Sequence, residues 1–217
     1  MGAGEALIAR ATNGARVMPK VAIVYHSGYG HTAKVAEAVA EGARQGAEVT
    51  VLKAEELGDP KGGDWAPLDE ADAIVFGSPT YMGSVSGEFE QFVDKTSKKW
   101  FTGAWRDKLA AGFTCSSSLS GDKQSTLLRM QVLAMQQGMV WVSLGLMPGK
   151  PEHPADDPEN LNRLGFYAGA AAQAGNDASP EEAPMASDLG TARALGTRVA
   201  DWAALVEAGR NATGGQG

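Results

Sequence analysis

The sequence predicts an α/β fold in which a doubly wound sheet of five parallel strands carries helices on both faces. Short apolar runs, typical of buried parallel strands, alternate along the chain with longer segments of helical periodicity. This alternation indicates strand–helix–strand crossovers, and no internal repeat competes with it. The 217 residues are 43% hydrophobic and 21% charged, which suits one globular domain with a substantial core.

Each predicted strand is a short apolar run, and each predicted helix carries an apolar stripe. The strands are expected at 21–26, 48–52, 72–77, 109–114 and 139–144. The helices are expected at 32–45, 86–96, 123–137 and 188–207. In the last helix Ser187 or Asp188 is expected as N-cap, and the buried stripe is formed by Leu195, Val199, Trp202 and Val206.

Two stretches are expected to lie on the surface. Residues 55–67 are rich in glycine, aspartate and proline. Residues 146–184 are rich in proline and alanine and are predicted to include a short helix at 161–174. A connection this long in a compact domain is typical of a lid or an interface segment. We therefore expect 146–184 to cover the substrate side of the site or to pack on a neighbouring subunit, and so to set acceptor choice.

Composition narrows the class of protein further. Residues 1–18 lack the apolar centre of a signal peptide and are expected to be a disordered extension or a cloning remnant. One domain is expected over 19–210, followed by a flexible tail at 211–217. The single Cys115 excludes an internal disulfide and favours the cytoplasm. The net charge of −7 argues against nucleic-acid binding, no apolar run is long enough for a membrane, and no His or Cys spacing indicates a metal site.

The loop between the first strand and the first helix is the most informative motif. It reads Ser27-Gly28-Tyr29-Gly30-His31-Thr32. Unpaired N–H groups at a helix start carry partial positive charge, so they bind phosphate without needing a lysine. The hydroxyl groups of Ser27 and Thr32 can donate to the same anion, and His31 is favoured as a further phosphate partner. The loop therefore predicts a ligand that carries a phosphate.

The glycine spacing leaves the identity of that ligand open. Gly28, Gly30 and Ala33 fit a loose dinucleotide fingerprint, which keeps a Rossmann-type NAD(P) dehydrogenase as an alternative.

The other strand ends should describe the same ligand, because ligands of such sheets bind beyond the carboxyl ends of the strands. The third strand ends in a rigid turn suited to a flat ring, formed by Pro79, Thr80, Tyr81, Met82 and Gly83. The fourth ends in hydroxyl and N–H groups suited to a ribityl chain and ring carbonyls, contributed by Ser116, Ser117, Ser118, Leu119 and Gly121. Three loops of this character predict FMN rather than NAD.

On these residues the chain resembles the flavodoxin-like NAD(P)H:quinone oxidoreductases of the tryptophan-repressor-binding-protein (WrbA) type. The similarity spans roughly 20–145 and the last helix, and it depends on the Tyr25-x-Ser27-x-Tyr29-Gly30-His31 pattern and on the Gly77-x-Pro79-Thr80 turn. The resemblance implies a flavodoxin-like fold with strand order 2-1-3-4-5, non-covalent FMN, and two-electron reduction of quinones by NAD(P)H. It also implies a homotetramer with active sites near subunit contacts, and a homodimer is the alternative assembly.

The resemblance also implies a substrate pocket near Tyr81, Trp100 and Gln137, with no obligatory acid or base. Trp100 matches a tryptophan often donated by another subunit, Gln137 stands where the family commonly has His, and Met82 where it has Phe. One stacking pocket that serves both substrates in turn predicts ping-pong kinetics. A flavodoxin-type electron carrier remains an alternative, although Trp100 and the 146–184 segment exceed what a carrier needs.

Overall fold

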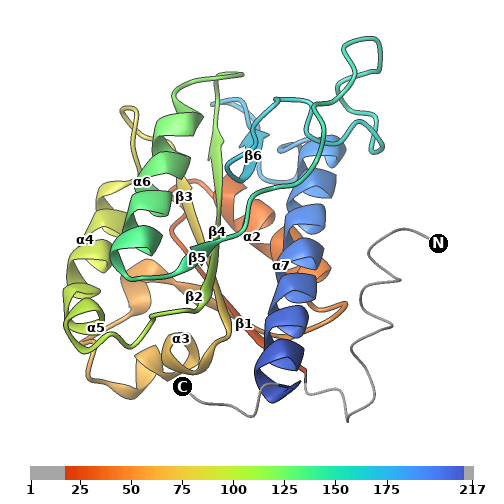
Figure 1. The fold of residues 1–217 in the computed structure, drawn as a ribbon. Helices are drawn as coiled ribbons and strands as arrows, with labels where there is room; N and C mark the ends of the chain where they lie inside the picture. Colours follow the sequence, from red (N-terminus) through yellow and green to blue (C-terminus); the bar gives the residue numbers. More distant parts are fainter. Residues whose placement is uncertain (1–17, 213–217) are drawn as a thin grey trace.

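A computed structural model describes residues 18–212 and shows a parallel sheet between two layers of helices (Figure 1). The strands run in the order β2-β1-β3-β4-β5, with β6 also paired to β4. Their bounds are β1 (Lys20–Tyr25), β2 (Glu48–Lys53), β3 (Ala73–Pro79), β4 (Leu109–Ser116), β5 (Val140–Trp141) and β6 (Ala170–Gln173). Every strand pair is parallel. The predicted doubly wound, flavodoxin-like fold and its strand order are confirmed.

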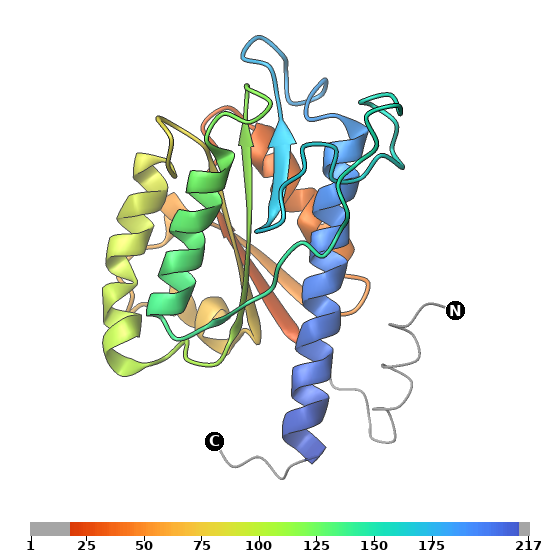
Figure 2. The same ribbon diagram turned by 45° about the horizontal axis from the view of Figure 1, so that its top comes forward.

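The helices divide between the two faces of the sheet (Figure 2). One face is covered by α2 (His31–Ala43) and α7 (Ala186–Ala212). The other is covered by α3 (Ala66–Glu70), α4 (Gly87–Lys95) and α6 (Lys123–Gln136). The short α5 (Ser97–Thr102), which the sequence pattern did not predict, follows α4, and the 3-10 turns η1 (Ala54–Glu56) and η2 (Gly63–Trp65) follow β2.

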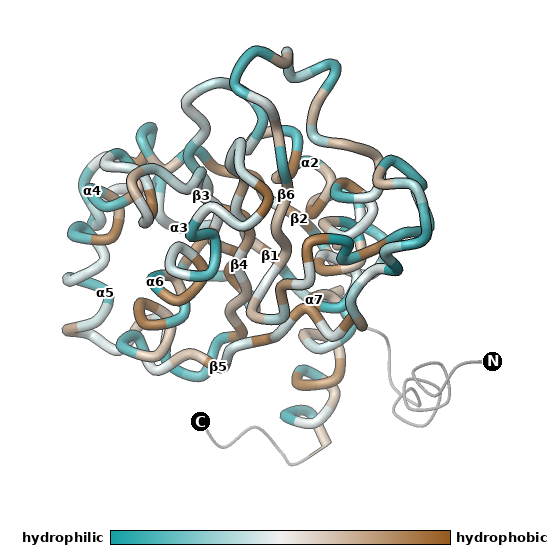
Figure 3. Tube along the Cα trace, turned by 90° about the horizontal axis from the view of Figure 1, so that it is seen from above, coloured by the Kyte–Doolittle hydropathy of each residue, from teal (hydrophilic) through white to brown (hydrophobic). Residues whose placement is uncertain are grey.

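Alternate residues of the buried strands form two separate cores, one on each face. In β1, Val21 and Ile23 pack toward α2 and α7, whereas Ala22 and Val24 pack on the opposite face. Viewed from above, the strands lie between α4 and α6 on one side and α7 on the other (Figure 3). Trp65, expected in a surface segment, is instead fully buried and stacks on Phe92, which fixes the 55–67 connection to the domain.

The fifth strand position is split into two pieces. β5 pairs with the first residues of β4, and β6 pairs with the last ones. The strand predicted at 139–144 is therefore shorter, and the helix predicted at 161–174 is wrong, because that stretch contains turns and β6. The alanines at 170–172 favour a helix by intrinsic propensity, but strand pairing and burial against β4 override it. The 146–184 segment is thus an interruption of the fifth strand.

The ends of the domain differ slightly from the sequence expectation. Residues 1–17 and 213–217, which include most of the predicted extension and tail, lie outside the described residues. α7 begins earlier than expected and continues through Asn211 and Ala212, which the prediction assigned to the tail. In the described part of the chain, no helix is both long and apolar enough to cross a membrane.

α2 and α7 approach each other closely because glycine stands at their contact. A Cβ atom placed on Gly196 would lie 1.9 Å from the Val39 carbonyl oxygen, and one on Gly42 would lie 2.0 Å from the Arg193 carbonyl oxygen. Both neighbours are helix backbone, which cannot move without displacing the whole element. The two glycines therefore set the distance between the helices that cover this face of the sheet.

We predict that Gly196→Ala lowers the free energy of unfolding by about 1–3 kcal/mol, the usual range for overpacking, because α7 must move away from α2. Urea denaturation measures the change. Gly209→Ala in the same helix is the control, since a Cβ there meets nothing within 4 Å and should stabilise the helix by roughly 0.5–1 kcal/mol. Similar effects of the two substitutions would contradict the prediction.

Candidate functional site

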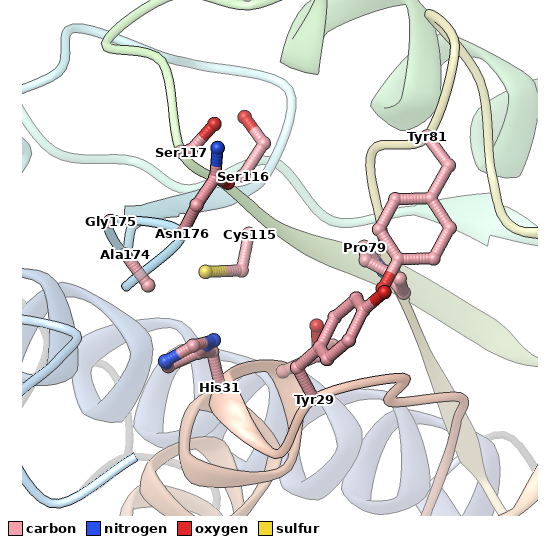
Figure 4. A pocket seen from close by; sticks show the side chains of 11 residues that line it. Tyr29, His31, Pro79, Tyr81, Cys115, Ser116, Ser117, Ala174, Gly175 and Asn176 are labelled. Carbon is pink, nitrogen blue, oxygen red and sulfur yellow. The ribbon is translucent and has the colours of Figure 1, made fainter. Parts of the chain in front are cut away.

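A pocket of about 300 Å³ opens at the carboxyl ends of β1, β3, β4 and β6 (Figure 4). Its walls come from Tyr29, His31, Thr32, Pro79, Tyr81, Cys115, Ser116, Ser117, Ala174, Gly175 and Asn176. Strand register explains part of this convergence, since Pro79 pairs with Cys115 and Cys115 pairs with Ala172. The structure thus brings together residues from all three loops that the sequence analysis selected.

The first loop turns sharply into α2 at Gly30. This residue is the N-cap of the helix and has a φ of 92°, in the left-handed region that glycine adopts without strain. The Ser27 hydroxyl oxygen accepts hydrogen bonds from the N–H groups of Gly30 and Ala33, each at 3.1 Å. Ser27 therefore fixes the loop, and its own O–H remains able to donate. Thr32, in the first turn of α2, is buried in the pocket wall.

His31 is hydrogen-bonded to the segment that follows β6. Its Nε2 atom lies 2.8 Å from the Ala178 carbonyl oxygen. A carbonyl can only accept, so Nε2 carries a proton in this contact and Nδ1 is left for another partner. Pro180 lies against Gly30, because a Cβ atom on that glycine would be 2.7 Å from its Cγ. Part of the 146–184 segment consequently covers the predicted phosphate loop.

The second loop is a tight hairpin that presents an aromatic ring. Tyr81 and Ser84 exchange backbone hydrogen bonds of 2.9 and 3.1 Å, and the two residues between them have positive φ angles. The Tyr81 ring meets Tyr29 edge-on, with centroids 6.5 Å apart. Partial burial, followed by the nearby Tyr29, raises the pKa of the Tyr81 phenol. Tyr81 is thus a protonated donor at neutral pH, 37% exposed at the pocket.

Other predicted ligand residues surround the pocket without lining it; they are Ser27, Gly28, Gly30, Thr80, Met82, Gly83, Ser118, Leu119 and Gly121. Thr80 is buried and bonds to the hydroxyl groups of Thr114 and Thr126, each at 2.8 Å, so it joins β3 to β4 and α6. Met82 and Leu119 are exposed to solvent at the ends of their loops.

Sequence reasoning missed four pocket residues. Cys115 pairs with Pro79 in the sheet and is one of the lining residues drawn in Figure 4. The other three, 174–176, directly follow β6. The rule that strand ends carry the ligand would have found Gly175 and Asn176 if the preceding alanines had been interpreted as a strand.

Trp100 and Gln137 are not brought to this pocket within one chain. Trp100 belongs to α5, near the edge where the strands begin, and is 53% exposed. Gln137 follows α6 at the same edge and is 5% exposed, and its Nε2 donates to the carbonyl and hydroxyl oxygens of Thr96 at 3.1 Å. The Gln137 side chain therefore links the ends of α6 and α4 and does not line the pocket.

The residues present fit a flat, polar ring that bears a phosphate. The helix start at Gly30 supplies backbone donors, and Tyr81 supplies an aromatic surface. The Ser116 hydroxyl oxygen is buried at the pocket and has no hydrogen-bond partner among the described residues. A pocket of this chemistry at this edge of a 2-1-3-4-5 sheet defines a flavodoxin-like FMN protein.

Comparison with known proteins agrees with this class. Residues 19–148 match the family described as NADPH-dependent FMN reductase, and the chain belongs to that family. The flavodoxin FldP of Pseudomonas aeruginosa is 45% identical over 183 residues, covering 84% of this chain and 96% of FldP. An NAD(P)H dehydrogenase (quinone) of Geotalea uraniireducens is 37% identical over 205 residues, covering 85% and 98%.

A solved structure gives the same result. The flavodoxin, WrbA-like protein from Agrobacterium tumefaciens is 42% identical, with a TM-score of 0.65, and the match covers 85% of this chain and 97% of that one. The resemblance drawn from the phosphate loop and the Pro79-Thr80 turn is therefore confirmed.

We predict that the single thiol of the native protein resists modification. Burial raises the pKa of Cys115 to about 12, so almost no thiolate forms at pH 8. Ellman's reagent should react with Cys115 slowly in the native protein and rapidly in urea, where the pKa returns to about 8.5. Because the folded pKa is the higher one, stability is expected to fall as pH rises above about 8.5. Equal reaction rates in the native and unfolded states would contradict the prediction.

Proposed function

We propose that the chain is an FMN-dependent oxidoreductase that transfers hydride from NAD(P)H to quinone-type acceptors. The observation that carries the proposal is the pocket itself, which is lined by the first turn of α2, by Tyr81 and by Ser116, whose buried hydroxyl has no hydrogen-bond partner in the described part of the chain. Family membership and relatives named NAD(P)H dehydrogenase (quinone) support the same reaction. Nucleic acid and membrane play no part in this proposal.

FMN would be held by the loops in separate roles. The start of α2 and Thr32 would bind the phosphate, while Tyr81, Ser116 and Ser117 would surround the ring. When bound, FMN accepts hydride and passes it on to the acceptor. The protein's contribution is orientation and hydrogen bonding. The Tyr81 O–H, kept protonated by its raised pKa, can donate to a carbonyl oxygen of the acceptor.

Ping-pong order is part of the proposal. The pocket has one aromatic hairpin beside its opening, formed around Tyr81, and both NAD(P)H and a quinone need a flat surface to stack on. The two substrates would occupy the same place in turn, so the oxidised nicotinamide would leave before the acceptor binds.

The assembly is proposed to be a homotetramer, with a homodimer as the smaller alternative. Trp100 is exposed beside Phe101, which is 85% exposed, and neither reaches the pocket of its own chain. A neighbouring subunit could place Trp100 at the pocket, whereas the buried Gln137 would keep its contact with Thr96.

A cytoplasmic location is supported by the one cysteine, which is a free thiol.

A second candidate function is a flavodoxin-type electron carrier. The observation that favours it is the 45% identity to a protein named flavodoxin. An electron carrier exchanges single electrons with protein partners and needs no pocket for a nicotinamide. The two functions therefore differ in how fast the protein itself oxidises NAD(P)H.

The decisive experiment measures NAD(P)H oxidation by the FMN-loaded protein with benzoquinone as acceptor. We expect rapid turnover and parallel double-reciprocal plots, which indicate ping-pong order. Turnover no faster than that of free FMN, together with efficient reduction by a separate flavodoxin reductase, would overturn the enzyme and support the carrier. Intersecting plots would overturn only the kinetic order.

We predict that Tyr81→Phe lowers kcat/KM for the quinone about fivefold, equivalent to one hydrogen bond of about 1 kcal/mol, while FMN affinity stays the same. The ring that faces the ligand is retained, and only the donor is lost. Steady-state kinetics and an FMN titration measure the two effects. Tyr167→Phe is the matched control, because Tyr167 is exposed in the inserted segment and does not line the pocket. An unchanged kcat/KM would exclude Tyr81 as a donor.

A further inference from the structure

The loop after β4 is held by the end of β6 and by the buried Lys123 of α6. We call residues 116–120 the serine loop. The carbonyl oxygen of Ser116 accepts from the Ala174 N–H at 3.2 Å, and that of Ser117 accepts from Gln173 Nε2 at 3.0 Å. Lys123 Nζ donates to the next two carbonyl oxygens, those of Ser118 and Leu119. Four successive carbonyl groups of the loop are therefore fixed from the interior.

Lys123 is an unusual residue for its position. It is fully buried at the start of α6, where the positive end of the helix dipole disfavours a cation. No carboxylate of residues 18–212 pairs with it within ion-pair distance, and burial lowers the pKa of its ammonium group. A buried amine in this setting costs stability. What it provides in return is two hydrogen bonds to the serine loop.

Gln173 reaches the serine loop from a fixed orientation. Its backbone N–H donates to Asp188 Oδ2 at 2.8 Å, and Arg163 Nη2 donates to the same carboxylate oxygen at 2.8 Å. Arg163 Nη2 also donates to Gln173 Oε1 at 3.2 Å, which leaves the Gln173 amide nitrogen directed at Ser117. The Arg163 and Asp188 side chains are both buried. Arg163 and Gln173 both belong to the 146–184 segment.

This anchoring determines where the donors of the serine loop point. In a trans peptide group the N–H is opposite to the C=O, so carbonyls held inward leave the N–H groups of 118–120 outward. None of these three N–H groups donates a hydrogen bond within the described chain. The Ser116 hydroxyl, in the pocket wall, also has no hydrogen-bond partner in the described chain. The loop thus carries several donors that are free of protein partners in the described chain and can bind an external acceptor.

We propose that Lys123 and Gln173 are positioning residues that turn the amide donors of the serine loop toward the pocket, where they bind the polar edge of the flavin ring. The inference rests on the proposed binding of FMN. It gives the inserted segment a role beyond covering the site, because Arg163 and Gln173 couple that segment to the ring-binding loop. It also separates recognition of the ring from recognition of the phosphate, which belongs to the loop before α2.

The experiment compares binding of FMN with binding of riboflavin, which has the same ring and no phosphate. We expect Lys123→Met, which keeps the length of the side chain and removes its donor, to raise the Kd of both flavins by the same factor, at least tenfold. The absorbance spectrum of the bound flavin should shift as well, since the hydrogen bonds to the ring change. Gly30→Val serves as reference and should weaken FMN binding much more than riboflavin binding, because it obstructs the phosphate loop.

Lys61→Met is the matched control, since Lys61 is exposed in the loop before α3, and it should leave both Kd values unchanged. Circular dichroism verifies that each variant is folded. Unchanged Kd values in folded Lys123→Met, or a loss confined to FMN, would overturn the inference. If that variant does not fold, Gln173→Leu decides by the same criterion. Failure of the unmodified protein to bind either flavin would instead overturn the proposed function, and the inference with it.

Discussion

Parallel pairing along β4 is the constraint on which the rest of the structure depends. β4 pairs with β3 on one side and with β5 and β6 on the other. The loops that follow β3, β4 and β6 therefore begin at the same edge of the sheet. Because the register sets Pro79 beside Cys115, and Cys115 beside Ala172, residues far apart in the sequence meet at one pocket. The helices on both faces then need only to keep this edge in place.

The polar contacts beneath the pocket show how an insertion can become part of a site. The chain leaves the sheet after β5 and returns with β6, and only on its return does it supply Gln173 and the pocket residues 174–176. The buried Arg163–Asp188 pair fastens this return to the start of α7. A break in the fifth strand therefore gives the pocket a wall that an uninterrupted strand would not provide.

Local patterns in the sequence were sufficient for the fold and for the strand-to-helix turn at 27–32. Apolar runs and the glycine at position 30 depend on short-range chemistry, so the structure contains the predicted strands and the predicted turn, while phosphate binding there stays a prediction. The helix predicted over the alanines of β6 was wrong. Their propensity favours a helix, but their pairing partners lie on β4, more than fifty residues earlier in the sequence. Lys123 appeared as an ordinary helix residue, since only the folded loop reveals its carbonyl partners. Trp100 was placed by resemblance, and its distance from the pocket depends on the path of the chain after α4.

The split fifth strand also limits how copies of this chain can meet. An exposed sheet edge invites another strand to extend it, and a long unbroken edge carries the greatest risk of aggregation. Here the edge beyond β4 consists of the two residues of β5 and the four of β6, with the chain departing between them. Continuous edge-to-edge pairing therefore has no template on this side of the sheet.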